Sequence, residues 1–325
     1  MRVVIVGGTG NISSSIVRLL LEKGHDVTLF NRGLRTAPGN VRVIQGDRRD
    51  RETFVKTMRR EKFDAAIDMI CFTPEEAEAS IAAFRGTGHF IHCSTVVTYG
   101  AEMNWAPVTE DHPLRPVNEY GRLKAEADRV LLKAYYEENF PVTILKPSTT
   151  YGHMRVLRQL GLDTRWLDRI RKNKPIAVCG DGKALHHFLH VDDAAKAFVG
   201  ALGKARCFGQ VYNLVNPTVT TWETYHRTAM KVLGREVEMV GIPLRSLLAF
   251  DASRFTMCAD YFVHSIVYSA AKILRDIPEF EATVSLEDGL RRTIARLDEL
   301  GWIENSDDQI WEDRLIEAQK MVGAF

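Results

Sequence analysis

Short apolar runs alternate with stretches of helical periodicity through the first half of the chain. The run Arg2–Val6 is apolar at every position after Arg2 and ends at Gly7, which is typical of a parallel strand buried on both faces. Apolar residues then recur at helical spacing from Ile12 to Leu20, and Gly24 follows them. The same patterns predict strands over Asp26–Phe30, Val41–Gln45, Ala65–Ile70, Phe90–Cys93 and Val142–Lys146, and helices over Phe54–Arg60, Pro74–Phe84 and Glu119–Glu138. This alternation predicts an α/β fold with a doubly wound parallel sheet.

The alternation breaks after Tyr151. Glycine, proline and basic residues mix over 153–182, and Phe188–Leu202 then returns to the pattern of the sheet domain. Further predicted elements are a strand over Val211–Val215, a helix over Trp222–Leu233, a strand over Val237–Val240 and an amphipathic helix over Ser285–Leu300. We therefore expect one domain from 1–150 with about 186–215, and a smaller, interleaved domain from about 151–185 with 216–325.

The composition is that of an ordinary soluble globular protein. The 325 residues include 43 basic and 42 acidic side chains, a net charge of +1, so charge gives no case for nucleic acid or a membrane surface as the main partner. The five cysteines are odd in number and have no zinc-ligand spacing, so we expect no metal site and reduced thiols in a cytoplasmic protein. No apolar stretch approaches the roughly 18 residues of a membrane span.

A glycine-rich turn connects the first predicted strand to the first predicted helix. In this turn, Gly7 allows a tight bend, and Gly10 lets the backbone approach a pyrophosphate whose charge is met by the helix N-terminus. Ser13 stands where the spacing G-x-x-G-x-x-G has its third glycine, and it is small enough for close helix packing. The turn therefore predicts a dinucleotide site that includes Gly7, Thr9, Gly10, Asn11 and Ile12.

The end of the second predicted strand bears on the choice between NAD and NADP. An acidic residue there binds the ribose hydroxyls, whereas an arginine accepts the 2′-phosphate. Asn31 and Arg32 occupy this position with Arg35 close by, so NADP is favoured over NAD; the alternative for Arg32 is a solvated loop charge. After the third predicted strand, Asp47 is placed to bind the adenine amino group, with Arg48 in the same site. The alternative is that Asp47 pairs with a neighbouring arginine.

A tyrosine and a lysine lie one helical turn apart on the predicted helix Glu119–Glu138. Tyr120 and Lys124 are at i and i+4, so both side chains occupy one helix face. A nearby ammonium favours the phenolate and lowers a tyrosine pKa, which makes Tyr120 usable as an acid and base near neutral pH. Lys124 is also able to hold the nicotinamide ribose of the cofactor.

Together these motifs resemble the extended short-chain dehydrogenase/reductase family, the NAD(P)-dependent epimerase/dehydratase group. The resemblance covers nearly the whole chain and is carried by Gly7–Gly10, Gly46-Asp47, Ser94–Gly100, Tyr120 with Lys124, Lys146-Pro147 through Gly152, and Phe188–Asp193. It implies a Rossmann domain for the cofactor and a smaller C-terminal domain for the substrate. It also implies that Thr95 is the catalytic hydroxyl residue, with Ser94 as the fallback, and that the segment from Pro147 lines the nicotinamide carboxamide.

The chain departs from the family pattern at the substrate site. Nucleotide-sugar enzymes of the family place an arginine on the diphosphate where this chain has His186 and His187, and histidine binds phosphate more weakly at neutral pH. His153, Ser94, Thr95 and His186 are the candidate substrate residues; a structural loop histidine is the alternative for His153. Family dehydratases follow the catalytic threonine with an Asp-Glu pair, and family decarboxylases carry a glutamate in that segment. Here Val96 and Val97 follow, and neither transfers a proton.

These observations lead to an NAD(P)-dependent sugar epimerase that works through a transient ketone, with a nucleotide-linked sugar as the expected substrate. The first alternative is a reductase or dehydrogenase that uses the same three residues with net redox change. The second is a non-catalytic nucleotide- or RNA-binding protein, because Phe30–Gly33 and Gly46–Asp50 also resemble chloroplast stem-loop RNA-binding proteins. The family resemblance further implies a homodimer.

Overall fold

The computed structural model describes residues 1–322, which divide into two compact units. Unit 1 comprises Met1–Thr150, Val191–Pro217 and Tyr268–Thr283. Unit 2 comprises Tyr151–His190, Thr218–Val267 and 284–322.

Unit 1 is built on a seven-stranded parallel sheet, which confirms the predicted fold class. The strand order is β11-β6-β5-β4-β1-β2-β3, and every pair in it runs parallel. The strands are β1 (Arg2–Val6), β2 (Asp26–Asn31), β3 (Arg42–Gln45), β4 (Ala65–Asp68), β5 (His89–Cys93), β6 (Val142–Pro147) and β11 (Gln210–Leu214). The order reverses between β1 and β4, and the carboxyl ends of strands at such a point form the usual ligand crevice of open α/β sheets.

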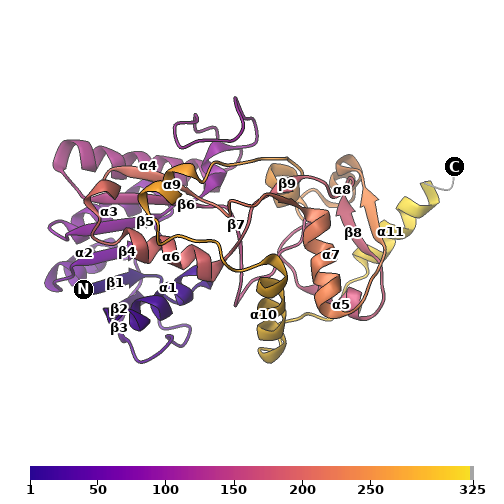
Figure 1. The fold of residues 1–325 in the computed structure, drawn as a ribbon, viewed down its shortest axis with the longest axis horizontal. Helices are drawn as coiled ribbons and strands as arrows, with labels where there is room; N and C mark the ends of the chain where they lie inside the picture. Colours follow the sequence, from indigo (N-terminus) through magenta and orange to yellow (C-terminus); the bar gives the residue numbers. More distant parts are fainter. Residues whose placement is uncertain (323–325) are drawn as a thin grey trace. The chain divides into compact units, whose positions relative to one another are not determined.

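Helices cover both faces of this sheet (Figure 1). On one face lie α1 (Asn11–Glu22) and α6 (Val191–Ala201), and on the other lie α2 (Arg51–Arg60), α3 (Pro74–Phe84) and α4 (Glu119–Glu138). Buried phenylalanines fill the second layer, among them Phe54, Phe84 and Phe90. Burial of these large apolar rings is the main favourable free-energy contribution to the packing of the helices on the sheet.

Local sequence signals set the ends of α3 and α4. Thr73 caps α3 by accepting from the Glu76 amide at 3.3 Å, and Pro74 follows at the first helical position. Asn118 caps α4 by accepting from the Gly121 amide at 3.0 Å, and Asn139 ends that helix in the left-handed conformation. These caps fix where Tyr120 and Lys124 stand on α4.

Unit 2 contains two short strand pairs, the strand β10 (Phe188–His190) and a group of helices around an aromatic core. The pairs are β8 (Ile176–Cys179) with β13 (Met239–Ile242), and β9 (Leu185–His186) with β12 (Thr220–Thr221). The strand β7 (Thr149–Tyr151) spans the boundary between the two units. The helices are α5 (Arg165–Arg171), α7 (Trp222–Leu233), α8 (Leu244–Asp251), α10 (Leu286–Glu299) and α11 (Trp311–Val322). Trp166, Trp222 and Tyr225 are fully buried in the core, as large apolar rings usually are.

Two segments lie in a different unit from the one that we expected. Residues 186–190 belong to unit 2, where β10 packs against α10. Residues 268–283, with the short helix α9 (Ala271–Asp276), belong to unit 1, where Tyr212 on β11 donates to Asp276 at 3.2 Å. The second difference depends on a contact over 64 residues of chain, which no local pattern encodes.

Two further features concern the whole described chain. All five cysteines are buried and unpaired. Across residues 1–322, every helix is too short or too polar to cross a membrane.

Candidate cofactor and catalytic site

The turn between β1 and α1 closes tightly against its neighbours. Gly7 has a φ of +86°, and a Cβ on it would lie 2.7 Å from Ile70 at the end of β4. A Cβ on Gly8 would lie 2.5 Å from Leu29 on β2. A side chain at Gly7 would need a strained positive φ and would push on the Ile70 side chain, and one at Gly8 would push on the Leu29 side chain, so glycine suits both positions.

Ser13, which stands in place of the third glycine, ties the turn together. Its hydroxyl donates to the Gly7 carbonyl at 2.8 Å and accepts from the Gly10 amide at 2.8 Å. The first turn of α1, which begins with Asn11 and Ile12, carries no acidic residue. The positive dipole end of this helix therefore meets no acidic side chain in the first turn, which suits a pyrophosphate.

A cavity of about 490 Å³ lies at the carboxyl edge of the sheet beside this turn. It includes seven of the predicted cofactor residues: Gly7, Thr9, Gly10, Asn31, Arg32, Asp47 and Arg48. Its volume is within the usual range for a cofactor pocket. The residues present therefore fit the adenosine and pyrophosphate parts of a dinucleotide.

The β2 end of the cavity is rich in arginine. Arg32 and Arg35 both line it, and Arg35 donates to the Thr9 carbonyl at 3.4 Å. Asp47 is held by Arg49 through three side-chain hydrogen bonds of 2.5–3.1 Å. These bonds lower the pKa of Asp47 to about 2, so the carboxylate is ionised and paired. Of the two alternatives for Asp47, the structure thus contains the pair with a neighbouring arginine.

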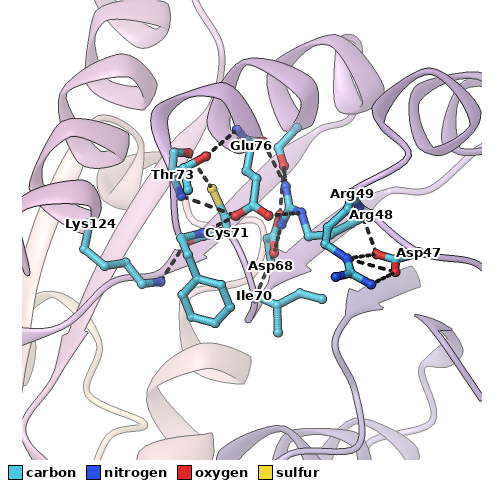
Figure 2. A network of polar contacts seen from close by, with 11 residues as sticks. Asp47, Arg48, Arg49, Asp68, Ile70, Cys71, Thr73, Glu76 and Lys124 are labelled. Atoms are coloured by element: carbon cyan, nitrogen blue, oxygen red, sulfur yellow. Dashed lines mark hydrogen bonds and ion pairs between the residues drawn. The ribbon is translucent and has the colours of Figure 1, made fainter. Parts of the chain in front are cut away.

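The side chain of Arg48 does not reach into the cavity as a free cation. It is buried and donates to both oxygens of Asp68, at 2.8 and 2.7 Å (Figure 2). It also donates to the Glu76 carbonyl at 2.8 Å and to Ser80 at 3.0 Å. Burial opposes the charge on Asp68, but Arg48 holds the pKa of that carboxyl below its usual range. No sequence pattern indicated this pair, because its two partners lie 20 residues apart in separate elements.

Lys124 is buried where α4 crosses the ends of β4 and β5. Its Nζ donates to the Cys71 carbonyl at 2.7 Å and to the Cys93 carbonyl at 2.6 Å, and it lies 4.7 Å from the ring centre of Phe72. Tyr120, one turn earlier on the same helix face, is 45% exposed, and its ring centre is 6.3 Å from that of Phe72. An ammonium group and an accessible phenol thus both lie beside one aromatic ring.

The structure separates the roles of Thr95 and Ser94. The Ser94 hydroxyl donates to Asp128 at 2.8 Å and is buried. The Thr95 hydroxyl accepts from the Val97 amide at 3.3 Å and caps the turn η1 (Val96–Tyr99), so its own proton stays available for donation. This geometry favours Thr95 over Ser94 as the group that meets a substrate oxygen.

A buried ion pair supports this end of the site. Lys146 donates to Asp128 at 2.7 Å and to the Thr98 hydroxyl at 2.7 Å, and Thr98 donates to the Thr95 carbonyl at 2.9 Å. Burial alone would raise the pKa of Asp128, but Lys146 and His92 hold it well below its usual range. The carboxylate therefore stays ionised and fixes the segment that carries Thr95. Pro147 follows Lys146 and ends β6.

The two histidines predicted at the substrate site belong to unit 2. His186 is buried among Phe188, Trp222 and Phe262, and burial lowers its pKa to about 4. A neutral, buried imidazole supplies no charge to a diphosphate, so we do not assign that role to it. The ring centre of His153 lies 5.6 Å from that of His190.

Sequence reasoning missed further residues of the cavity wall, among them Leu34, Ile70, Phe72 and Glu76. Ile70 and Phe72 follow β4, and the rule that ligands bind at the carboxyl ends of parallel strands was the signal that could have found them. We did not predict them as site residues because apolar residues after a strand usually belong to the hydrophobic core.

Comparison with known proteins places these observations in a family. A family model described as "NAD dependent epimerase/dehydratase family" matches residues 3–214. The 2'-dehydrokanamycin reductase of Streptomyces kanamyceticus is 28% identical over 246 residues, which span 75% of this chain and 70% of that protein. The chloroplast stem-loop binding protein of 41 kDa b of Arabidopsis thaliana is 25% identical over 91% of this chain and 80% of its own length.

The fold is shared with solved structures. The UDP-glucose 4-epimerase of Thermus thermophilus, in complex with NAD, aligns with a TM-score of 0.74 at 19% identity, over 92% of this chain and 99% of that one. At this identity the likeness establishes the architecture and nothing about the substrate.

Proposed function

Because this chain belongs to the NAD-dependent epimerase/dehydratase family and is an NAD(P)-dependent enzyme of the extended short-chain dehydrogenase type, we propose that it epimerises a carbinol carbon of a sugar. The proposed substrate class is a nucleotide-linked sugar, and the proposed route passes through a transient ketone. One observation carries the proposal: Lys124 is buried and donates to the carbonyls of Cys71 and Cys93. These hydrogen bonds hold α4 against the end of β5, and Thr95 follows shortly after that strand.

Three side chains divide the proton chemistry. The nicotinamide cofactor, when bound, would accept and return the hydride. Tyr120 would take the proton of the substrate hydroxyl and give it back, because an accessible phenol beside an ammonium is a usable acid and base. Thr95 would donate to the substrate oxygen, and Lys124 would favour the phenolate and hold the ribose.

Elimination of water is the less suitable chemistry for this site. It needs an acid at the leaving hydroxyl and a base at the neighbouring carbon. The residues after Thr95 are Val96 and Val97, and Val96 is buried. Of the two activities in the family's description, epimerisation is therefore the one that this segment supports.

We propose NADP as the cofactor. Arg32 and Arg35 line the cavity where the adenosine ribose would lie, and Asp47 is already neutralised by Arg49. A planar guanidinium binds a 2′-phosphate well, and Asp47 in its pair with Arg49 does not repel it.

A reductase is the second candidate, and two observations favour it. A relative over three quarters of the chain is named a reductase, and an arginine-rich adenosine site suits the cofactor that carries reducing power. This candidate would use the same Thr95, Tyr120 and Lys124 with net consumption of NADPH.

Nucleic acid is not proposed as a partner, although one relative is named for stem-loop binding. Of the basic run Arg48–Arg51, Arg48 is buried and Arg49 is paired with Asp47. An RNA site requires a broader basic surface than the rest of this run provides. A homodimer through α4 is a proposal by analogy with the family.

Two measurements test the proposal. The purified protein is denatured, and mass spectrometry identifies any released cofactor; retained oxidised NADP supports the epimerase. Nucleotide sugars are then incubated with the enzyme and either cofactor. Inversion at one carbon without loss of NADPH is the expected result, stoichiometric oxidation of NADPH would establish the reductase instead, and a protein that binds neither cofactor would refute both. Light scattering measures the oligomeric state.

A further inference from the structure

Arg48 is a residue of the cofactor cavity whose side chain the proposed chemistry does not use. It is 4% exposed, and four hydrogen bonds of 2.7–3.0 Å hold its guanidinium on Asp68, Glu76 and Ser80. A guanidinium with these bonds acts on the protein and not on a ligand. The other hydrogen bonds of its partners show which segment of the protein it supports.

The two carboxylates around Arg48 also hold the backbone of the loop 69–73. Asp68 accepts from the Ile70 amide at 3.0 Å. Glu76 accepts from the amides of Phe72 at 2.6 Å and Thr73 at 3.3 Å, and its other oxygen lies 3.7 Å from Arg48. Arg48 therefore orients both carboxylates, and they in turn fix three of the loop's amides (Figure 2).

The loop 69–73 contacts both halves of the site. Ile70 and Phe72 line the cofactor cavity, and Ile70 packs so closely on Gly7 that a Cβ there would lie 2.7 Å away. The carbonyl of Cys71 accepts from Lys124 at 2.7 Å, and the Phe72 ring lies beside the same ammonium. One short loop thus joins the glycine turn to Lys124.

We propose that Arg48 is a positioning residue that fixes the loop 69–73, and through it the cavity wall and Lys124. The inference rests on the proposed function, in which Lys124 holds the ribose and assists Tyr120. A guanidinium suits this role because Nη1 donates to both oxygens of Asp68 while Nη2, in the same plane, donates to the Glu76 carbonyl and to Ser80; a lysine ammonium has only three donors on one atom.

The test compares three variants. The double variant Arg48→Met with Asp68→Leu removes both charges, so no unpaired buried charge is left to unfold the protein. Arg48→Lys keeps the charge and loses the second donor nitrogen. The matched control is Arg158→Met with Glu312→Leu in unit 2, which removes another buried arginine–carboxylate pair, with bonds of 2.8 and 2.6 Å, whose carboxylate also accepts a backbone amide, that of Ala177.

The first measurement is hydrogen–deuterium exchange of the cofactor-free proteins. In the double variant, the amides of Ile70, Phe72 and Thr73 should exchange at least about tenfold faster than in the wild type, because their acceptors are lost or released. The control should leave these amides unchanged. Unchanged exchange in a folded double variant would overturn the proposal.

The second measurement is NADPH affinity by fluorescence, followed by turnover. The double variant should bind more weakly and lose up to about 10²-fold in kcat, the typical effect of misplacing a catalytic group by an ångström. Arg48→Lys should recover part of the loss, and the control should match the wild type. Faster exchange with wild-type affinity and turnover would overturn the positioning role. If the wild type binds neither cofactor, the proposed function is refuted, and the exchange data alone decide whether Arg48 fixes the loop.

Discussion

The hydroxyl of Ser13 donates a hydrogen bond of 2.8 Å to the carbonyl of Gly7. The same oxygen accepts from the Gly10 amide at 2.8 Å, so one buried side chain spans the phosphate-binding turn. A glycine at position 13 would allow the same close packing but would leave both backbone groups without this partner. The departure from the three-glycine spacing thus stiffens the turn that would hold the cofactor.

Replacement of Ser13 by alanine should destabilise the protein by roughly 1–3 kcal/mol and weaken dinucleotide binding, because two partly buried backbone groups lose their partner. Urea unfolding and calorimetric titration with NADP measure the two effects. Thr293→Val is the control, since it removes a buried hydroxyl that donates to the Gly289 carbonyl at 2.7 Å in α10. Equal cofactor affinity in wild type and Ser13→Ala would show that the turn does not depend on this bond.

Tyr120→Phe should lower turnover by roughly 10²–10⁴-fold, the usual contribution of a positioned acid and base. The side chain is 45% exposed, so folding and cofactor binding should be nearly unchanged. Tyr136→Phe, on the same helix and 74% exposed, is the matched control and should retain full turnover. Turnover at the wild-type rate in Tyr120→Phe would remove the mechanism.

Arg32→Ala should weaken the binding of NADP much more than that of NAD, because only NADP carries the 2′-phosphate. Titration of both cofactors into wild type and variant gives, for each cofactor, the ratio of the two dissociation constants. Arg85→Ala removes an exposed arginine that pairs with Glu138 outside this cavity, and it controls for the change in net charge. Equal losses for the two cofactors, or a wild-type preference for NAD, would contradict the assignment of Arg32.

Stability should fall in mild acid because His89 is buried in its neutral form. Its Nε2 lies 2.8 Å from the Thr143 hydroxyl, its Nδ1 accepts from the Gly203 amide at 3.1 Å, and burial lowers its pKa to about 4. The unfolded chain protonates near pH 6.5, so between about 6.5 and 4 it binds a proton that the folded chain does not. The contribution of neutral His89 to folding stability is therefore full above about pH 6.5, and roughly 3 kcal/mol of it is lost as the pH falls to about 4.

Urea unfolding at a series of pH values measures this dependence. His89→Gln keeps a donor for Thr143 and cannot titrate, so its stability should fall less steeply with acid than that of the wild type. His186 and His226 titrate in both proteins and cancel in the comparison. Parallel curves for the two proteins would rule out a proton-linked contribution from His89.

The enzyme should release neither water nor carbon dioxide from a sugar substrate. Val96 and Val97 supply no acid or base beside Thr95, so the site is expected to exchange hydride and proton only. Incubation with a panel of nucleotide sugars in heavy water, followed by NMR and mass spectrometry, checks this. A product lighter by one water or one carbon dioxide would mean that another residue provides the missing acid.

Several elements could be predicted from the sequence because their signals are local. The strand Arg2–Val6 and the helices Pro74–Phe84, Glu119–Glu138 and Trp222–Leu233 have the predicted bounds, since caps and apolar periodicity act over a few residues. The glycine turn and the Tyr120–Lys124 pair were visible for the same reason. By contrast, α5, α8 and α11 lie in a part of the chain where no simple periodicity stood out.

The sequence by itself determined the doubly wound sheet, the glycine turn and the spacing of Tyr120 and Lys124, because each depends on neighbours along the chain. Only the tertiary structure decided that Arg48 binds Asp68, that Lys124 lies between the carbonyls of Cys71 and Cys93, and that His186 is buried among aromatic rings. Those contacts join residues 20 to 53 positions apart, or place a polar ring in a core built from several segments. These contacts depend on burial and on hydrogen bonds between segments that are distant in the sequence. The pattern of residues within one segment does not identify the residue that a side chain will contact in another.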